Sequence, residues 1–207
     1  MHISQAYTQW AATYDTDRNL TRDLDATMTR GVLGGRKVAT ALELGCGTGK
    51  NTALLAEIAQ QVYALDFSEG MMAQARAKIN KAQVAFALAD LTQPWPCATG
   101  CVELVVCNLV LEHIRDLDFI FAEAWHVLTE GGQFYLSELH PFKQYQGKQA
   151  VFERGGEQTP IAAFVHHISD FVAAAQGAGF TLTKLGEWWH DEDPPDTPRL
   201  VTFLFTK

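Results

Sequence analysis

The sequence lacks an excess of positive charge. Of its 207 residues, 24 are acidic and 16 are basic, so the formal net charge is −8 at pH 7. No cluster of lysines or arginines interrupts this balance. The chain therefore lacks the electrostatic footprint of proteins that bind phosphate backbones. We expect no nucleic acid among its partners.

Long apolar runs and paired cysteines are also missing. No apolar run approaches the roughly 20 residues that a membrane-spanning helix needs. The N-terminal stretch MHISQAYTQW has no basic region followed by an apolar one, as a secretory signal would. The four cysteines form no C-x-x-C pair and no tetrahedral set with nearby histidines. We expect a cytoplasmic protein with reduced thiols, no membrane contact and no metal ion.

Short apolar runs alternate along the chain with segments of helical spacing. Strands are expected at 38–45, 61–68, 83–91, 102–111 and 132–140, and helices at 51–60, 68–81, 116–132 and 168–180. This alternation predicts a mainly parallel sheet with helices on both faces. Two final strands, at 181–191 and 199–207, have no room for a crossover helix between them and should pair antiparallel.

These elements predict one domain over residues 1–207 with a seven-stranded, doubly wound α/β sheet whose last strand is antiparallel. Residues 1–35 stand outside the alternating pattern and suggest helices that precede the first strand, which we interpret as a lid. The segment 141–165 is long for a simple connection and is expected to be an irregular insertion that shapes an acceptor pocket.

A glycine-rich stretch, ALELGCGTGKNT, spans residues 41–52. A phosphate-binding P-loop would require a glycine at Leu44 and a serine or threonine at Asn51. The dinucleotide motif G-x-G-x-x-G would require its third glycine at Lys50. The P-loop is therefore excluded, and a dinucleotide survives only as a degenerate match.

Two aspartates end the strands that follow this loop. Asp66 ends the second expected strand and Asp90 ends the third. The carboxyl ends of parallel strands meet at one edge of the sheet, where open α/β sheets bind ligands. A lone aspartate there is usually a solvated strand end or a helix cap. Two in successive strands favour a binding site, in which Asp66 can accept both hydroxyls of a ribose.

Five ordered motifs together resemble the class I S-adenosylmethionine-dependent methyltransferases that act on small molecules. They are ELGCGTG (43–49), ALDFSEGMMAQAR (64–76), ALADLTQPWP (87–96), LVVCNLVLEHIRD (104–116) and EAWHVLTEGGQFYLSE (123–138). The resemblance covers residues 38–140 and extends more loosely to 207. It implies a Rossmann-like fold, S-adenosylmethionine as cofactor, and methyl transfer to a small-molecule acceptor with an oxygen atom favoured. A monomer or a homodimer is expected.

The resemblance also implies which residues contact the cofactor. The glycines would face its methionine and ribose portions, Asp66 would hold the ribose hydroxyls, and Asp90 would accept the adenine amino group. Tyr14 belongs to an N-terminal W-x-x-x-Y-D pattern that closes over the cofactor in relatives. The full set is Glu43, Gly45, Gly47, Gly49, Asp66, Phe67, Met71, Asp90, Leu91, Asn108 and Tyr14.

The acceptor side is defined less sharply. Methyl transfer from a sulfonium needs orientation and exclusion of water, and an alcohol or phenol acceptor would also benefit from a base. His140 and His167 match histidines that some relatives carry after the fifth strand and before the following helix, so they are the predicted catalytic residues. The alternative is that they satisfy backbone groups. His113, after the fourth strand, resembles a family position that is mostly structural. A non-catalytic binding protein on the same fold and an NAD(P)-dependent oxidoreductase remain as rival functions.

Overall fold

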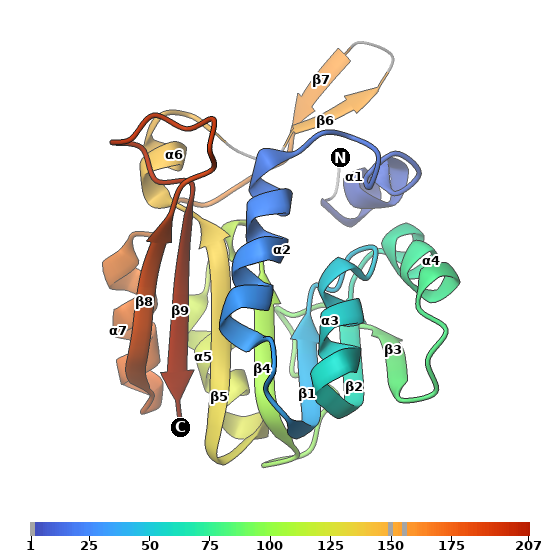
Figure 1. Cartoon of the computed structure of the whole chain (residues 1–207), viewed down its shortest axis with the longest axis vertical. Helices are drawn as coiled ribbons and strands as arrows, with labels where there is room; N and C mark the ends of the chain where they lie inside the picture. Colours follow the sequence, from blue (N-terminus) through green and yellow to red (C-terminus); the bar gives the residue numbers. More distant parts are fainter. Residues whose placement is uncertain (1–2, 149–150, 155–156) are drawn as a thin grey trace.

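The computed structural model describes residues 3–148, 151–154 and 157–207. These residues form a seven-stranded sheet in the order β3-β2-β1-β4-β5-β9-β8 (Figure 1). Strands β1 to β5 are parallel, and β9 lies antiparallel between β5 and β8. The predicted doubly wound sheet with an antiparallel last strand is therefore confirmed. Its strands are β1 (Val38–Leu44), β2 (Ala59–Asp66), β3 (Val84–Leu88), β4 (Val102–Asn108), β5 (Leu128–Leu139), β8 (Thr181–Trp188) and β9 (Leu200–Thr206).

Helices cover both faces of the sheet. Figure 1 shows α2 (Leu20–Leu33) and α3 (Lys50–Ile58) in front of it, and α5 (Leu117–Val127) and α7 (Ile168–Ala178) behind it. Helix α4 (Glu69–Lys78) packs beside β2 and β3, and α1 (Ile3–Trp10) lies next to α4. Side chains of Asn19, Ser68 and Asp116 accept backbone N–H bonds at the starts of α2, α4 and α5. These caps determine where three of the helices begin.

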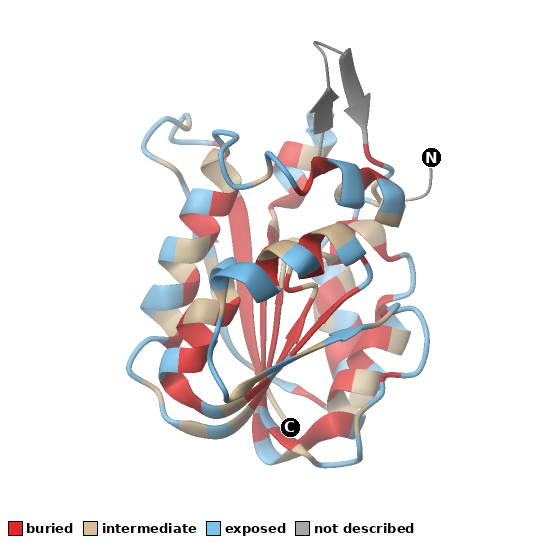
Figure 2. Ribbon diagram, turned by 90° about the vertical axis from the view of Figure 1, so that its right-hand side faces the viewer, coloured by how far each residue is buried: buried red, intermediate tan, exposed pale blue. Residues whose placement is uncertain are grey.

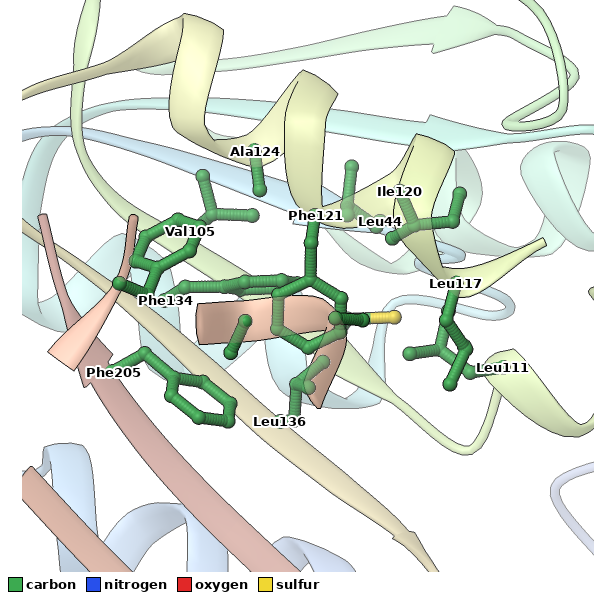
Figure 3. Packing of buried hydrophobic residues seen from close by; sticks show 14 of the residues in the cluster. Leu44, Val105, Leu111, Leu117, Ile120, Phe121, Ala124, Phe134, Leu136 and Phe205 are labelled. Carbon is green, nitrogen blue, oxygen red and sulfur yellow. The ribbon is translucent and has the colours of Figure 1, made fainter. Parts of the chain in front are cut away.

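The core consists of two layers that alternate along each strand. Val105 and Cys107 of β4 face α5 and α7, whereas Leu104 and Val106 belong to the layer under α2 and α3. This period of two follows from the geometry of a strand whose two faces are both covered. Phe121 of α5 packs edge-on against aromatic rings of β5 and β9 (Figure 3). Buried residues accordingly concentrate between the helix layers (Figure 2).

Two segments differ from the sequence prediction. Strand β5 begins at Leu128, directly after α5, because Leu128 already pairs with Val102 of β4. The next pair joins Leu104 and Gln133, so residues 129–132 form an irregularity within the strand. The helix predicted to reach residue 132 therefore ends at Val127. The insertion 141–165 is not irregular, since it contains α6 (Pro141–Tyr145) and an antiparallel hairpin of β6 (Val151–Arg154) and β7 (Glu157–Pro160). Residues 149–150 and 155–156 of this insertion, and 1–2 of the extension, lie outside the described residues.

Candidate functional site

A cavity of about 240 Å³ lies at the carboxyl ends of β1, β2 and β4, with residues of α1 contributing to its wall. Parallel sheets place ligands at this edge. The cavity gathers residues that are distant in the sequence, and most of the predicted cofactor contacts are among them. Those that line it are Tyr14, Gly45, Gly47, Asp66, Phe67, Met71, Asp90, Leu91 and Asn108.

Asp66 organises the glycine loop from the end of β2. Its carboxylate accepts N–H bonds of 2.8 Å from both Gly47 and Ser68. Burial raises the pKa of this carboxyl, while the backbone hydrogen bonds oppose that rise. Each carboxylate oxygen can accept a second hydrogen bond, so Asp66 retains the capacity to hold two vicinal hydroxyl groups.

The three glycines of the loop have different surroundings. Gly45 has a φ of +67°, and a Cβ there would lie 2.3 Å from Cγ2 of Val110. A Cβ at Gly47 would meet no protein atom within 4 Å, so the space beside this backbone is open. Gly49 is not a lining residue, because it directly precedes α3 and packs against Ala75 of α4. The backbone of the loop thus borders open space at Gly47 and is closely packed at Gly45 and Gly49.

Glu43 also lies outside the cavity lining. Its side chain is buried behind the loop and accepts a hydrogen bond of 2.5 Å from the hydroxyl of Thr52. Burial raises the pKa of Glu43 to about 8, with the hydrogen bond from Thr52 acting against this rise. The role of Glu43 as a cofactor contact stays a prediction, and its position shows that it supports the loop from behind.

At the end of β4, Asn108 links the cavity to the N-terminal extension. Its amide nitrogen donates to Asp25 at 2.7 Å and to Thr29 at 2.8 Å, both of α2. Its carbonyl oxygen is buried and has no hydrogen-bond partner among the described residues. An unpaired buried acceptor in a cavity wall is typical of a site that receives a ligand donor. Asp25 was not identified from the sequence, because a helical aspartate usually faces solvent.

His113 and Tyr7 form a pair that the sequence analysis missed. The Nδ1 of His113 lies 2.9 Å from the carbonyl oxygen of Ala162, and its Nε2 lies 2.7 Å from the hydroxyl of Tyr7. A carbonyl only accepts, so the Nδ1 carries the proton and the Nε2 accepts from Tyr7. Burial raises the pKa of the Tyr7 phenol well above its ordinary value. Both side chains line the cavity, and only their distance in the sequence concealed the pair.

The two predicted catalytic histidines lie elsewhere. His140 caps α6 by accepting from the N–H of Phe142, and its other ring nitrogen lies 2.8 Å from a Glu187 carboxylate oxygen. His167 begins α7, and its ring contacts the hydroxyl of Tyr145 at 2.6 Å. Neither residue lines the cavity. Their catalytic role stays a prediction, and their positions instead fit the alternative that they satisfy neighbouring polar groups.

Within the described part of the chain, no group of three or more histidine, cysteine, aspartate or glutamate side chains is arranged to hold a metal ion. No described helix combines the length and the apolar character that crossing a bilayer requires. The four cysteines are free thiols, of which Cys46 and Cys107 are buried.

Comparison with known proteins agrees with this geometry. The family model described as a methyltransferase domain matches residues 42–136, which run from β1 to β5. An uncharacterized methyltransferase of Emericella nidulans is 30% identical over 87% of this chain and 76% of its own length. The chain belongs to the class I S-adenosylmethionine-dependent methyltransferases. This methyltransferase is accordingly an enzyme by family, and the predicted oxidoreductase alternative loses its basis.

Two further relatives help to place the methyltransferase. A malonyl-[acyl-carrier protein] O-methyltransferase of Geobacter sulfurreducens is 26% identical over 96% of this chain and 77% of its own length. The solved structure of a Mesorhizobium loti S-adenosylmethionine-dependent methyltransferase shares the fold with a TM-score of 0.73 at 19% identity, covering 87% of this chain and 96% of that one. Several other curated relatives are longer, and the chain spans between 29% and 53% of their length.

Proposed function

We propose that this methyltransferase binds S-adenosylmethionine in the cavity at the carboxyl ends of β1, β2 and β4 and transfers its methyl group to a small-molecule acceptor, with an oxygen atom favoured. The cavity wall that joins Asp66, Gly47 and Asn108 carries this proposal. The residues fit the cofactor, since a carboxylate suits a ribose, open space lies beside Gly47, and the Asn108 carbonyl has no protein partner.

The favoured oxygen acceptor has support from the relatives. The Geobacter sulfurreducens protein is named as an O-methyltransferase, and the similarity to it extends over nearly the whole chain. When bound, the cofactor supplies an activated methyl group on a sulfonium, so the protein has to orient the acceptor, exclude water and remove a proton where the acceptor carries one.

His113 is the group best placed to accept such a proton. Its Nε2 is the free-base nitrogen of the ring because the Nδ1 proton is directed at the Ala162 carbonyl. An acceptor hydroxyl that takes the position of the Tyr7 hydroxyl would meet this nitrogen at hydrogen-bond distance. We therefore propose His113 as the proton acceptor, with the Ala162 carbonyl orienting the ring and the Tyr7 hydroxyl giving way to the acceptor hydroxyl when the acceptor binds.

Calorimetric titration tests the cofactor part of the proposal. The wild-type protein should bind S-adenosylmethionine and S-adenosylhomocysteine but not NAD. Asp66→Asn should weaken both by about tenfold or more, since it loses a charge-assisted acceptor. Asp118→Asn, at an exposed position in the first turn of α5, is the matched control. Unchanged affinity in Asp66→Asn, in a protein that remains folded, would remove Asp66 from the site.

Single-turnover assays with an identified acceptor test the catalytic part and separate an enzyme from a non-catalytic binding protein. His113→Gln keeps a polar side chain but cannot take up a proton, so methyl transfer to a hydroxyl acceptor should fall while S-adenosylhomocysteine affinity persists. A wild-type rate in His113→Gln would show that positioning alone accounts for the chemistry. Absence of transfer to every member of a broad metabolite panel would favour the non-catalytic alternative.

A further inference from the structure

A second cavity, of about 390 Å³, adjoins the cofactor cavity. Tyr7, Tyr14 and Leu109 line both, so these three side chains form the boundary between the two spaces. Much of the remaining wall comes from the start of α2, from α6 and from the residue before β9, and Trp10, Glu112 and Leu139 also line it. These elements lie at the same end of the sheet as α1 (Figure 1).

Positive charge dominates this second wall. Four basic residues line the cavity, and Glu112 is the one acidic residue among the described lining residues. Burial raises the pKa of Glu112, although the neighbouring His113 opposes the rise. The four basic residues are Arg22, Lys143, Lys148 and Arg199. A cluster of positive charge is unusual in a protein with 24 acidic and 16 basic residues.

Arg22 is buried but forms no ion pair with the described residues. Its guanidinium donates to the backbone carbonyls of Tyr14 and Asp17 and lies 4.0 Å above the centre of the Tyr14 ring. These contacts use two of its five N–H groups and fix the plane of the guanidinium. No carboxylate pairs with it directly, although its charge helps to lower the pKa values of the nearby Asp15 and Asp23. The N–H groups that these contacts leave unused are suited to an anionic ligand.

Lys143 and Arg199 share a single counter-ion. Asp193 accepts from the Lys143 ammonium at 2.9 Å and from the Arg199 Nε at 2.8 Å. Although burial opposes ionisation, hydrogen bonds from these two cations lower the pKa of Asp193 well below its ordinary value. Two positive charges thus share one negative charge, so Lys143 and Arg199 together contribute a net charge of one to the wall of the second cavity.

We infer that this second cavity is the acceptor site and that it takes a small molecule with an anionic oxygen group, a carboxylate or a phosphate, which Arg22 anchors with help from Lys143 and Arg199. The inference rests on the proposed methyl transfer and extends it to the class of acceptor. A molecule anchored at Arg22 extends toward Tyr7 and Leu109, and hence toward the cofactor cavity and the Tyr7–His113 pair. A guanidinium of fixed orientation binds planar carboxylates and phosphates through paired hydrogen bonds.

Titration calorimetry with succinate, inorganic phosphate and neutral succinamide tests the anion site, both with and without S-adenosylhomocysteine. Succinate or phosphate should bind and succinamide should not; preference between the two anions identifies the group that the site recognises. Arg22→Met should weaken anion binding by about tenfold or more, and Arg22→Lys should restore part of it. Arg18→Met is the control, since this exposed arginine pairs with the exposed Glu192 away from the cavity lining.

The outcomes separate the two proposals. Failure of S-adenosylhomocysteine to bind would overturn the proposed function, whereas anion binding measured without it still tests the second cavity. Equal binding of succinamide, or unchanged anion affinity in Arg22→Met, would overturn the inference. If Arg22→Met does not fold, Arg199→Gln replaces it, because Arg199 is a partly exposed cation of the same lining and the inference gives it a share in holding the anion. A loss of anion affinity in Arg199→Gln supports the inference, and wild-type affinity contradicts it.

Discussion

Replacing Glu43 by glutamine should change how the stability of the protein depends on pH. The pKa of Glu43 rises from an ordinary value of 4.5 to about 8 because the side chain is buried. Between these two values the native state binds a proton that the unfolded state has released. The free energy of unfolding therefore falls as pH rises through this window, by up to about 1.4 kcal/mol per pH unit from this one group.

Glutamine removes that contribution because it does not titrate. The unfolding free energy of Glu43→Gln minus that of the wild type should thus increase by about 2.7 kcal/mol between pH 5.5 and pH 7.5. Other buried carboxyls, such as Glu138 with a pKa raised by burial to about 8, are present in both proteins and largely cancel in the difference. Urea denaturation followed by tryptophan fluorescence at several pH values measures it.

Glu69→Gln is the control, because Glu69 is exposed at the start of α4. Because folding does not bury this side chain, the difference in unfolding free energy between Glu69→Gln and the wild type should not change with pH. A flat difference for Glu43→Gln as well would mean that Glu43 is ionised in the folded protein. The same variant should keep S-adenosylhomocysteine affinity within about threefold; a larger loss would return Glu43 to the cofactor contacts, as the sequence motif predicts.

Four more substitutions test the glycines and the predicted histidines. Gly45→Ala would force a Cβ to within 2.3 Å of Val110 at a φ of +67°, so it should destabilise the protein by roughly 1–3 kcal/mol and reduce S-adenosylhomocysteine affinity. Gly31→Ala, in a helix with no atom within 4 Å of the new Cβ, should instead stabilise by roughly 0.5–1 kcal/mol in the same thermal and urea unfolding assays. His140→Ala should lose about 1 kcal/mol of stability from the α6 cap, and both it and His167→Ala should keep wild-type methyl-transfer rates. A collapse of turnover in either histidine variant, with cofactor affinity intact, would establish the catalytic role that the sequence predicts.

The order of strands and helices follows from local sequence pattern. Apolar runs that end in Gly45, Asp66 and Asn108 mark the strands, and the crossover rule for parallel strands places their ends at one edge. The cavity at that edge was predictable for the same reason. Gly49 and Glu43 lie outside its lining, since a motif identifies a loop without showing which of its members face the open space.

The acceptor side could not be predicted because it depends on long-range packing. Tyr7 meets His113 only after α1 folds over the end of β4, and Arg22 meets Lys143 and Arg199 only after α2, α6 and β9 converge. Contacts between residues so far apart in the chain produce no periodicity or spacing in the sequence from which they could be predicted. His140 and His167 drew attention because histidines near strand ends and helix starts suit both catalysis and capping.

All four cations of the second cavity come from outside residues 42–136, the span that the family model matches. The cofactor cavity, by contrast, draws most of its wall from within that span. Under the two proposals above, the span that matches the family model holds the methyl donor, and segments outside that span hold the acceptor. It follows from them that new side chains on α2, on α6 and at the residue before β9 would change the acceptor and leave the wall of the cofactor cavity as it is.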